Sequence, residues 1–177
     1  MKQRWPQFID FRNATYRHLV NGRSLSERDV EAIFENLVLG PLGYSPAQLD
    51  RQPDFADYVL LERDLKIAIV EIKGWEAFHI SDNQRKALEQ AAGYAGRHRC
   101  KNIMAFDGRV MVLAECQQDS ISVLFEIPVD TADPVDELFY FTEYGLSKLP
   151  GKCVFGMYLI LHLLFQKSNK SSELKKT

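Results

Sequence analysis

The chain has 177 residues, of which 46% are hydrophobic and 26% are charged. This composition is typical of a globular protein and excludes the disordered and collagen-like classes. The formal net charge of −2 excludes a uniformly basic surface for unspecific nucleic-acid binding, so any such binding must be local. The length predicts one domain plus tails.

The cysteines and the apolar segments indicate a cytoplasmic protein. Cys100, Cys116 and Cys153 are scattered without CxxC spacing, which predicts reduced thiols rather than a zinc site or a disulfide framework. The N-terminus lacks the unbroken apolar core of a signal peptide. Only 153–165 is a candidate membrane segment, and it is shorter than the roughly 20 residues that a spanning helix needs. We therefore expect a buried helix or strand there and no membrane partner.

The first strong helix pattern is "SLSERDVEAIFENLVLGPLGY", which predicts a helix over 26–39. Ser24 or Ser26 can cap it, and Gly40-Pro41 ends it. Its apolar stripe comprises Val30, Ile33, Phe34 and Leu37.

Two strands follow, "DYVLLE" and "KIAIVEIK", joined through the turn Arg63-Asp64-Leu65. The run "IAIV" has no polar alternation, which predicts a central strand covered on both faces.

The rest of the chain alternates between helices and strands. "SDNQRKALEQAAGYAGRHR" predicts a helix capped by Ser81 or Asp82 and ending near Ala95. "KNIMAF", "RVMVLAE" and "ISVLFEI" predict strands, the first two joined by the tight turn Asp107-Gly108. "ADPVDELFYFTEYGL" predicts a helix that begins near Pro134. The expected fold class is α/β, with a mixed central sheet flanked by helices.

Charged residues gather at one end of the predicted hairpin. A three-residue turn pairs Glu62 with Lys66, so Asp57 lies opposite Glu71 with β-carbons about 5 Å apart. Lys73 shares a face with Glu71, because side chains alternate along a strand. Two close carboxylates favour a divalent ion, and Mg²⁺ prefers oxygen ligands from one or two carboxylates, water and phosphate. With an ammonium beside them, the arrangement predicts a phosphodiester hydrolase.

A structural interpretation of the same residues stays open. Asp57 can be a polar residue at a strand edge, and Glu71 and Lys73 can form an exposed ion pair. Gln90 and Tyr94 lie four residues apart on one helix face and can serve packing alone. Glu27 lies on the flank of the first helix's buried stripe and can merely favour the helix dipole. On the same helix we expect Glu31 further round and Glu35 facing solvent.

Together these pieces resemble the PD-(D/E)XK nuclease superfamily, most closely the N-terminal nuclease domain of type I restriction enzyme R subunits. The matching stretches are "SERDVEAIFENLVLGPLGY", "ADYVLLERDLKIAIVEIKG", "ALEQAAGYA" and "NIMAFDGRVMVLAE", with "LFYFTEYGLSKLP" a weaker match.

The resemblance implies an αβββαβ core and Mg²⁺-dependent cleavage of DNA, with Mn²⁺ as an expected substitute. Partners such as other restriction-modification subunits or a translocase are expected, and double-strand cutting with one site per chain would predict two copies in a homodimer. By motif position, the implied metal ligands are Asp57, Glu71 and the carbonyl of Ile72. The other implied catalytic residues are Lys73, Glu27 as a helper carboxylate, and the pair Gln90 and Tyr94.

The chain also departs from the family pattern. Pro53-Asp54 matches the motif literally, but Asp54 would lie roughly 10 Å beyond the pair to Glu71, so we prefer Asp57. No G-x-x-x-x-G-K-[ST] pattern is present, so a phosphate-cradling motor motif is missing from this sequence. The predicted DNA contacts are Arg85, Lys86, Arg97, His98, Arg99, Lys101 and the basic N-terminal arm.

Four segments and three functions follow from these patterns. We expect a basic arm at 1–23, a nuclease-like domain at 24–150, an apolar segment at 151–166 and a disordered polar tail at 167–177. The leading function is a DNA endonuclease. A non-cutting module that binds DNA or a protein, and an enzyme acting on RNA or branched DNA, stay open.

Overall fold

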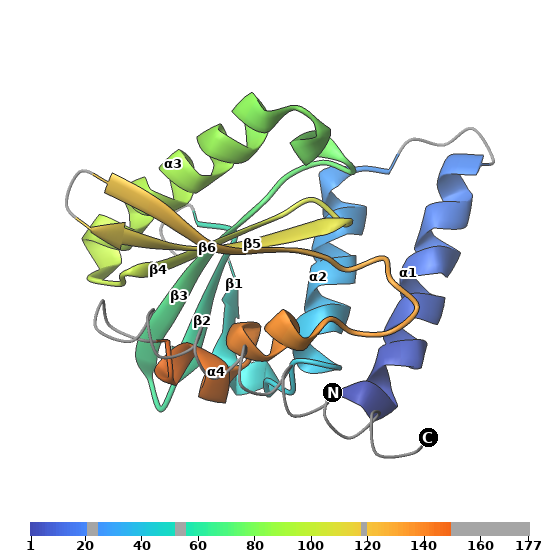
Figure 1. Ribbon diagram of the computed structural model, residues 1–177, viewed down its shortest axis with the longest axis horizontal. Helices are drawn as coiled ribbons and strands as arrows, with labels where there is room; N and C mark the ends of the chain where they lie inside the picture. Colours follow the sequence, from blue (N-terminus) through green and yellow to red (C-terminus); the bar gives the residue numbers. More distant parts are fainter. Residues whose placement is uncertain (21–24, 52–55, 118–119, 150–177) are drawn as a thin grey trace, which may run out of the picture. The chain divides into compact units, whose positions relative to one another are not determined.

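Six strands form one mixed sheet in the computed structural model of the protein, which describes residues 1–20, 25–51, 56–117 and 120–149. The strands follow one another across the sheet in chain order (Figure 1). Neighbours are antiparallel except β3 and β4, which are parallel. The strands are β1 (Leu49–Arg51), β2 (Tyr58–Glu62), β3 (Leu65–Ile72), β4 (Asn102–Phe106), β5 (Val110–Gln117) and β6 (Ser120–Pro128).

Helices cover both faces of this sheet, which confirms the predicted α/β class. Phe34 of α2 packs on Tyr58 and Phe106 on one face. The apolar side of α3 packs on the other face, against Val59, Ile69 and their neighbours. The helices are α1 (Trp5–Val20), α2 (Glu27–Leu39), α3 (Ser81–His98) and α4 (Glu143–Ser147). Short 3₁₀ helices are η1 (Lys2–Arg4), η2 (Pro46–Gln48), η4 (Ala77–His79) and η5 (Asp136–Phe141).

The β2–β3 turn is shorter than the sequence predicts. Arg63 and Asp64 both have positive φ, at 46° and 68°, as a two-residue type I′ turn requires. Glu62 therefore pairs with Leu65 rather than with Lys66. The predicted three-residue turn is wrong, because two residues suffice when their backbone matches the twist of the strands.

A bulge then corrects the register by one residue. The pairing shifts between Leu60 and Leu61, and beyond this point Tyr58 pairs with Val70. Continuing this register brings Asp57 beside Glu71, as the longer turn would have done. The central residues of β3 are buried, which confirms that the strand is covered on both faces.

Helix α2 agrees with its prediction and helix α3 differs at both ends. Ser26 caps α2 and forms a capping box with Asp29. Ile80 precedes α3 and provides no side-chain cap, contrary to the expected Ser81 or Asp82. The helix continues through Gly96 to His98, and its C-cap is Arg99, which has φ of 54°. The left-handed residue that closes the helix is therefore an arginine, three positions after the expected glycine.

The predicted helix beginning near Pro134 is wrong. The chain forms η5 and then α4, with Thr142 extended between them. The Thr142 hydroxyl accepts a hydrogen bond from the Gly145 backbone, so it caps the second, shorter helix. A β-carbon on Gly145 would lie 2.0 Å from the Phe139 carbonyl, so this close approach requires glycine.

Residues Met1–Ser147 group into one compact unit. Of the 1–23 segment, residues 5–20 form α1, in which Trp5 and Phe8 are buried. Asp54, Cys153, the apolar segment 153–165 and the tail lie outside the described residues. Within the described residues, no helix combines the length and apolar character needed to cross a membrane.

Candidate functional site

Glu71 and Lys73 meet at the end of β3. Glu71 pairs with Ala105 of β4 and points to the α3 face, where its side chain is only 2% exposed. The Lys73 backbone donates a hydrogen bond to the Phe106 carbonyl at 2.8 Å, which keeps the chain extended past the strand's end. The Lys73 ammonium consequently lies on the same face, 2.5 Å from Glu71 Oε1.

Helix α3 extends this pair into a hydrogen-bonded chain. Lys73 Nζ also donates to Gln90 Oε1 at 3.1 Å, and Gln90 Nε2 donates to the Tyr94 hydroxyl at 3.3 Å. The four-residue spacing of Gln90 and Tyr94 places both on one helix face. The structure therefore brings together Glu71, Lys73, Gln90 and Tyr94.

Asp57 reaches the site through the backbone of β3. Its Oδ2 accepts a hydrogen bond from the Ile72 N–H at 2.6 Å, just beyond the last β2–β3 pair. The Asp57 carboxylate, Ile72 and the Glu71 side chain thus lie at one end of the hairpin. Burial raises the pKa of Asp57, and the Ile72 N–H and Lys73 oppose this rise.

Burial dominates the electrostatics of Glu71. Desolvation, together with the charges of Asp57 and Glu27, raises the pKa of Glu71 to about 7, although the Lys73 hydrogen bond opposes the rise. A buried carboxylate that titrates near neutrality binds a proton or a cation readily.

Glu27 is the exposed first residue of α2 and acts on the site at longer range. Its charge raises the pKa values of Glu71 and Glu31. Glu31 is the residue that we expect further round the helix from Glu27. Its pKa is raised mainly by burial and also by the charge of Asp57. The sequence signal for Glu31 was its four-residue spacing from Glu27.

Glu35 does not face solvent as predicted. Its carboxylate accepts two hydrogen bonds from Arg51, at 2.7 and 2.8 Å, and one from the Tyr58 hydroxyl at 2.9 Å. These hydrogen bonds tie α2 to β1 and β2 and lower the pKa of Glu35. Strand β1, which carries Arg51, was not individually predicted, so the partner could not be foreseen.

The carboxylate oxygens of the site include a candidate ligand for a metal ion. Glu71 Oε2 is buried and has no hydrogen-bond partner in the described part of the chain. A buried, unpaired carboxylate oxygen is costly unless a ligand satisfies it. No group of three or more His, Cys, Asp or Glu side chains with metal-binding geometry occurs among the described residues. Two carboxylates fit Mg²⁺, which keeps water ligands, better than they fit a closed zinc site.

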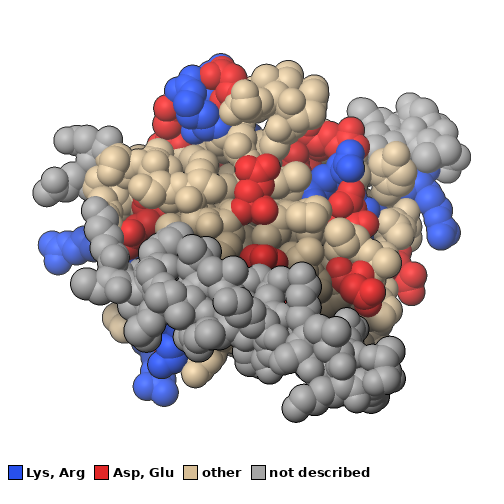
Figure 2. Space-filling model, viewed as in Figure 1, with Lys and Arg blue, Asp and Glu red and all other residues tan. Residues whose placement is uncertain are grey.

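The basic residues predicted to contact DNA are largely engaged with other side chains. Arg85 and Lys86 form ion pairs with Asp82, and Lys101 pairs with Glu115. On the face shown in Figure 2, acidic and basic residues are interspersed outside the atoms drawn in grey.

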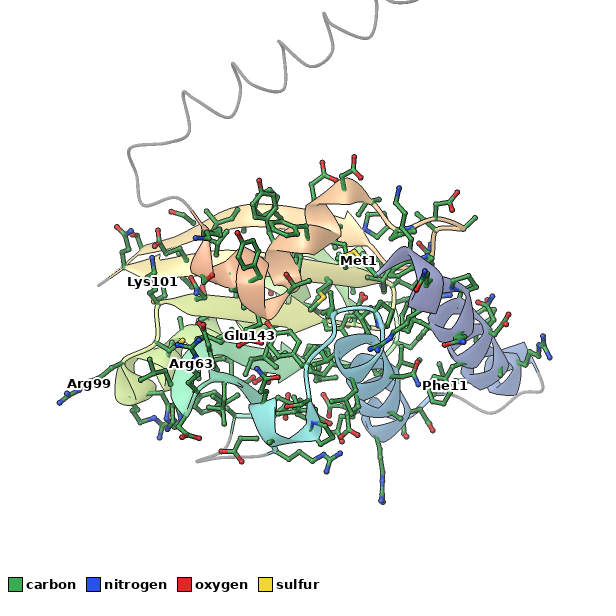
Figure 3. All side chains as sticks on the ribbon, turned by 90° about the horizontal axis from the view of Figure 1, so that it is seen from below. Met1, Phe11, Arg63, Arg99, Lys101 and Glu143 are labelled. Carbon is green, nitrogen blue, oxygen red and sulfur yellow. The ribbon has the colours of Figure 1, made fainter. Side chains whose placement is uncertain are left out.

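Two of the predicted DNA contacts, Arg99 and Lys101, lie away from the candidate site. Lys101 directly precedes β4, at the opposite end of that parallel strand from Ala105 and Glu71. Arg99 and Lys101 lie toward the end that carries Arg63 of the hairpin turn (Figure 3). Arg97 stacks on the Tyr94 ring, 5.0 Å from its centroid, and is the predicted contact most directly linked to the site.

Helix α1 holds the loop after Lys73 in place, which the sequence did not predict. The Arg12 guanidinium lies over the Trp75 ring, and its Nε donates to the Gly108 carbonyl at 3.0 Å. Tyr16 packs on the same ring. Gly108 has φ of 87°, and a β-carbon there would lie 2.5 Å from Trp75. Trp75, two residues beyond Lys73, is therefore fixed by contacts from α1 and from the β4–β5 turn.

Comparisons of the chain with known protein families, with curated proteins and with solved structures found no match. Function is therefore inferred from the motif pattern and from the geometry of this site.

Proposed function

We propose that the protein is a divalent-metal-dependent DNA endonuclease of the PD-(D/E)XK type. The observation that carries this proposal is the buried Glu71 carboxylate. Lys73 holds one of its oxygens, and the other has no hydrogen-bond partner among the described residues. Such a group is costly in a purely structural role, since burial disfavours its charged form. A cation-binding role accounts for its position beside Asp57.

The order of elements supports the proposal. Helix α2, strands β1 to β3, helix α3 and strand β4 follow one another as α-β-β-β-α-β. This is the order that the motif resemblance implies, with β3 carrying the E-x-K triplet and α3 the Q-x-x-x-Y pair.

Asp57, Glu71 and the Ile72 carbonyl would hold the ion, and Glu27 lies near enough to influence it electrostatically. When bound, Mg²⁺ or Mn²⁺ would supply charge stabilisation to the phosphate and lower the pKa of water. Lys73 would keep its proton on Nζ and stabilise negative charge that develops at the phosphate. Gln90 would orient the Lys73 ammonium, because its Oε1 accepts a hydrogen bond from Nζ.

A second candidate is a non-cutting module that binds DNA or a protein. The ion pairs that engage Arg85, Lys86 and Lys101 favour it, because they leave fewer cations for phosphate.

A restriction-type nuclease would bind other restriction-modification subunits or a translocase. A homodimer with one site per chain would cut both DNA strands.

Plasmid cleavage separates the candidates. Supercoiled DNA is incubated with the wild-type chain and Mg²⁺ or Mn²⁺, beside Lys73→Ala and the control Arg63→Ala in the exposed turn. We expect nicking by the wild type and by Arg63→Ala but none by Lys73→Ala or in EDTA. Equal nicking by Lys73→Ala would reject the catalytic assignment, and DNA binding without cleavage would support the module.

A further inference from the structure

A polar cavity lies between α2 and the β1–β2 edge of the sheet. Its volume is about 430 Å³, within the range of small-ligand sites. The lining residues are Arg28, Glu31, Ala32, Glu35, Arg51 and Tyr58. None of these residues is assigned to the metal site proposed above.

Hydrogen bonds connect the side chains of one wall of this cavity. Glu35 accepts hydrogen bonds from Arg51 Nε and NH2 and from the Tyr58 hydroxyl, so three side chains from α2, β1 and β2 fix one another. A bidentate arginine–carboxylate pair has a defined geometry. This wall is preorganised, and its polar groups are largely satisfied before any ligand arrives.

The polar groups that α2 contributes at Arg28 and Glu31 differ from those of this hydrogen-bonded wall. Arg28 and Glu31 line the cavity and take no part in those three hydrogen bonds. They are three residues apart, so they lie on one side of the helix, and the small side chain of Ala32 leaves space beside them. The cavity therefore offers one cationic fork and one carboxylate next to each other.

The cavity also adjoins the metal site. The charges of Asp57 and Glu27 act on Glu31, so the cavity lies within electrostatic range of the residues proposed to hold the metal. A group bound in the cavity would consequently lie close to a phosphate positioned by the metal ion that Asp57 and Glu71 would hold. In a nucleic acid, that group would be a neighbouring nucleotide.

Paired donors and acceptors favour one base over the others. Guanine offers the parallel donors N1–H and N2–H to a carboxylate, and its O6 and N7 accept from an arginine fork. Adenine and cytosine offer a single exocyclic amino group, and thymine offers none. A phosphate group fits less well, because Arg51 is paired with Glu35 and the remaining cation, Arg28, lies beside the Glu31 carboxylate.

We infer that this cavity binds a guanine base with a free Watson–Crick edge, through Glu31 and Arg28. The inference deepens the proposed function and rests on it for the nucleotide's place next to the cut bond. It specifies the substrate as nucleic acid in which a guanine near that bond is unpaired or flipped out of a duplex.

The binding test needs no catalysis. The ¹⁵N-labelled full chain is titrated with GMP, AMP, CMP or TMP in EDTA, and backbone amide signals are followed by NMR. We expect shifts in α2 and β1 with GMP at about tenfold or more lower concentration than with the other nucleotides, as one bidentate contact allows. Arg28→Ala and Glu31→Gln should each abolish this preference, whereas Arg63→Ala should keep it. Equal shifts with all four nucleotides, or an unchanged preference in both variants, would overturn the inference.

Cleavage mapping distinguishes this inference from the proposed function. On a single-stranded DNA library, the wild type should cut at a fixed distance from guanine, and Arg28→Ala should cut without that preference. Guanine-selective binding without any cleavage would reject the nuclease and keep the guanine site. Cleavage without base preference, together with equal binding of the four nucleotides, would reject the guanine site and keep the nuclease.

Discussion

Glu71 and Lys73 form an ion pair whose two members differ sharply in exposure, at 2% for the carboxylate and 26% for the ammonium. The acid is thus desolvated while its partner reaches solvent. Within the described parts of the chain only one oxygen of this buried acid is paired, so the acid destabilises the fold unless it binds a proton or a cation.

Replacing the acid should stabilise the cation-free protein. Glu71→Gln removes the charge that burial disfavours and keeps the shape of the side chain. The Glu71 pKa of about 7 lies above its ordinary 4.5, so the folded state binds the extra proton between these values. Stability contributed by this proton is present below pH 4.5 and is lost as the pH rises through 7.

The measurement is urea unfolding in EDTA from pH 5 to pH 8. Wild type should lose up to about 3 kcal/mol of unfolding free energy relative to Glu71→Gln across this range. Parallel curves for the two proteins would show that Glu71 keeps an ordinary pKa.

Cation binding should show the opposite pH dependence. A divalent ion competes with the proton on Glu71, so its affinity should fall about tenfold per pH unit below 7. The increase in Tm caused by Mn²⁺ should therefore be large at pH 8 and small at pH 5.5. Asp57→Asn should reduce the increase at both pH values, and an equal increase in Glu71→Gln would place the ion elsewhere.

Much of this site was predictable because it depends on local pattern. The unbroken run in β3 identifies a central strand, and alternation places Glu71 and Lys73 on one face. Asp57 was placed correctly beside Glu71 even though the turn was not, because the bulge at Leu60 and Leu61 offsets the shorter turn. No signal in the sequence distinguishes a two-residue turn followed by a bulge from a three-residue turn without a bulge.

The missed features depend on tertiary contacts. Glu35 looked solvent-facing on an isolated helix, and only the placement of β1 brings Arg51 to it. The sequence predicts only a basic arm where α1 forms, and the packing role of this helix appears only where Arg12 contacts Trp75 and Gly108. Contacts between side chains that lie 16 to 96 residues apart cannot be read from periodicity.

The Arg12 contact provides a test of how α1 supports the site. Arg12→Ala leaves the buried Gly108 carbonyl without its donor and removes the cation over Trp75, so we expect a loss of about 2 kcal/mol of stability. Urea unfolding measures this loss. Arg17→Ala, on the same helix, is the matched control and should change stability by less than about 0.5 kcal/mol. A loss in the control as large as that in Arg12→Ala would contradict the role of the Gly108 and Trp75 contacts.

Gly108→Ala should be more harmful than its small size suggests. Gly108 has φ of 87°, and the added β-carbon would meet the Trp75 ring at 2.5 Å. We expect a loss of about 1 to 3 kcal/mol of stability and a changed Trp75 fluorescence spectrum. Gly93→Ala on α3, where a β-carbon meets nothing within 4 Å, is the control and should stabilise the helix by up to about 1 kcal/mol.

Anomalous diffraction from a crystal of the full chain soaked in Mn²⁺ tests the central assignment most directly. We predict a peak within coordination distance of both Asp57 and Glu71 that disappears in Glu71→Gln. A Mn²⁺ peak elsewhere, with Glu71 contacting only Lys73, would contradict the assignment of these two carboxylates as the metal site.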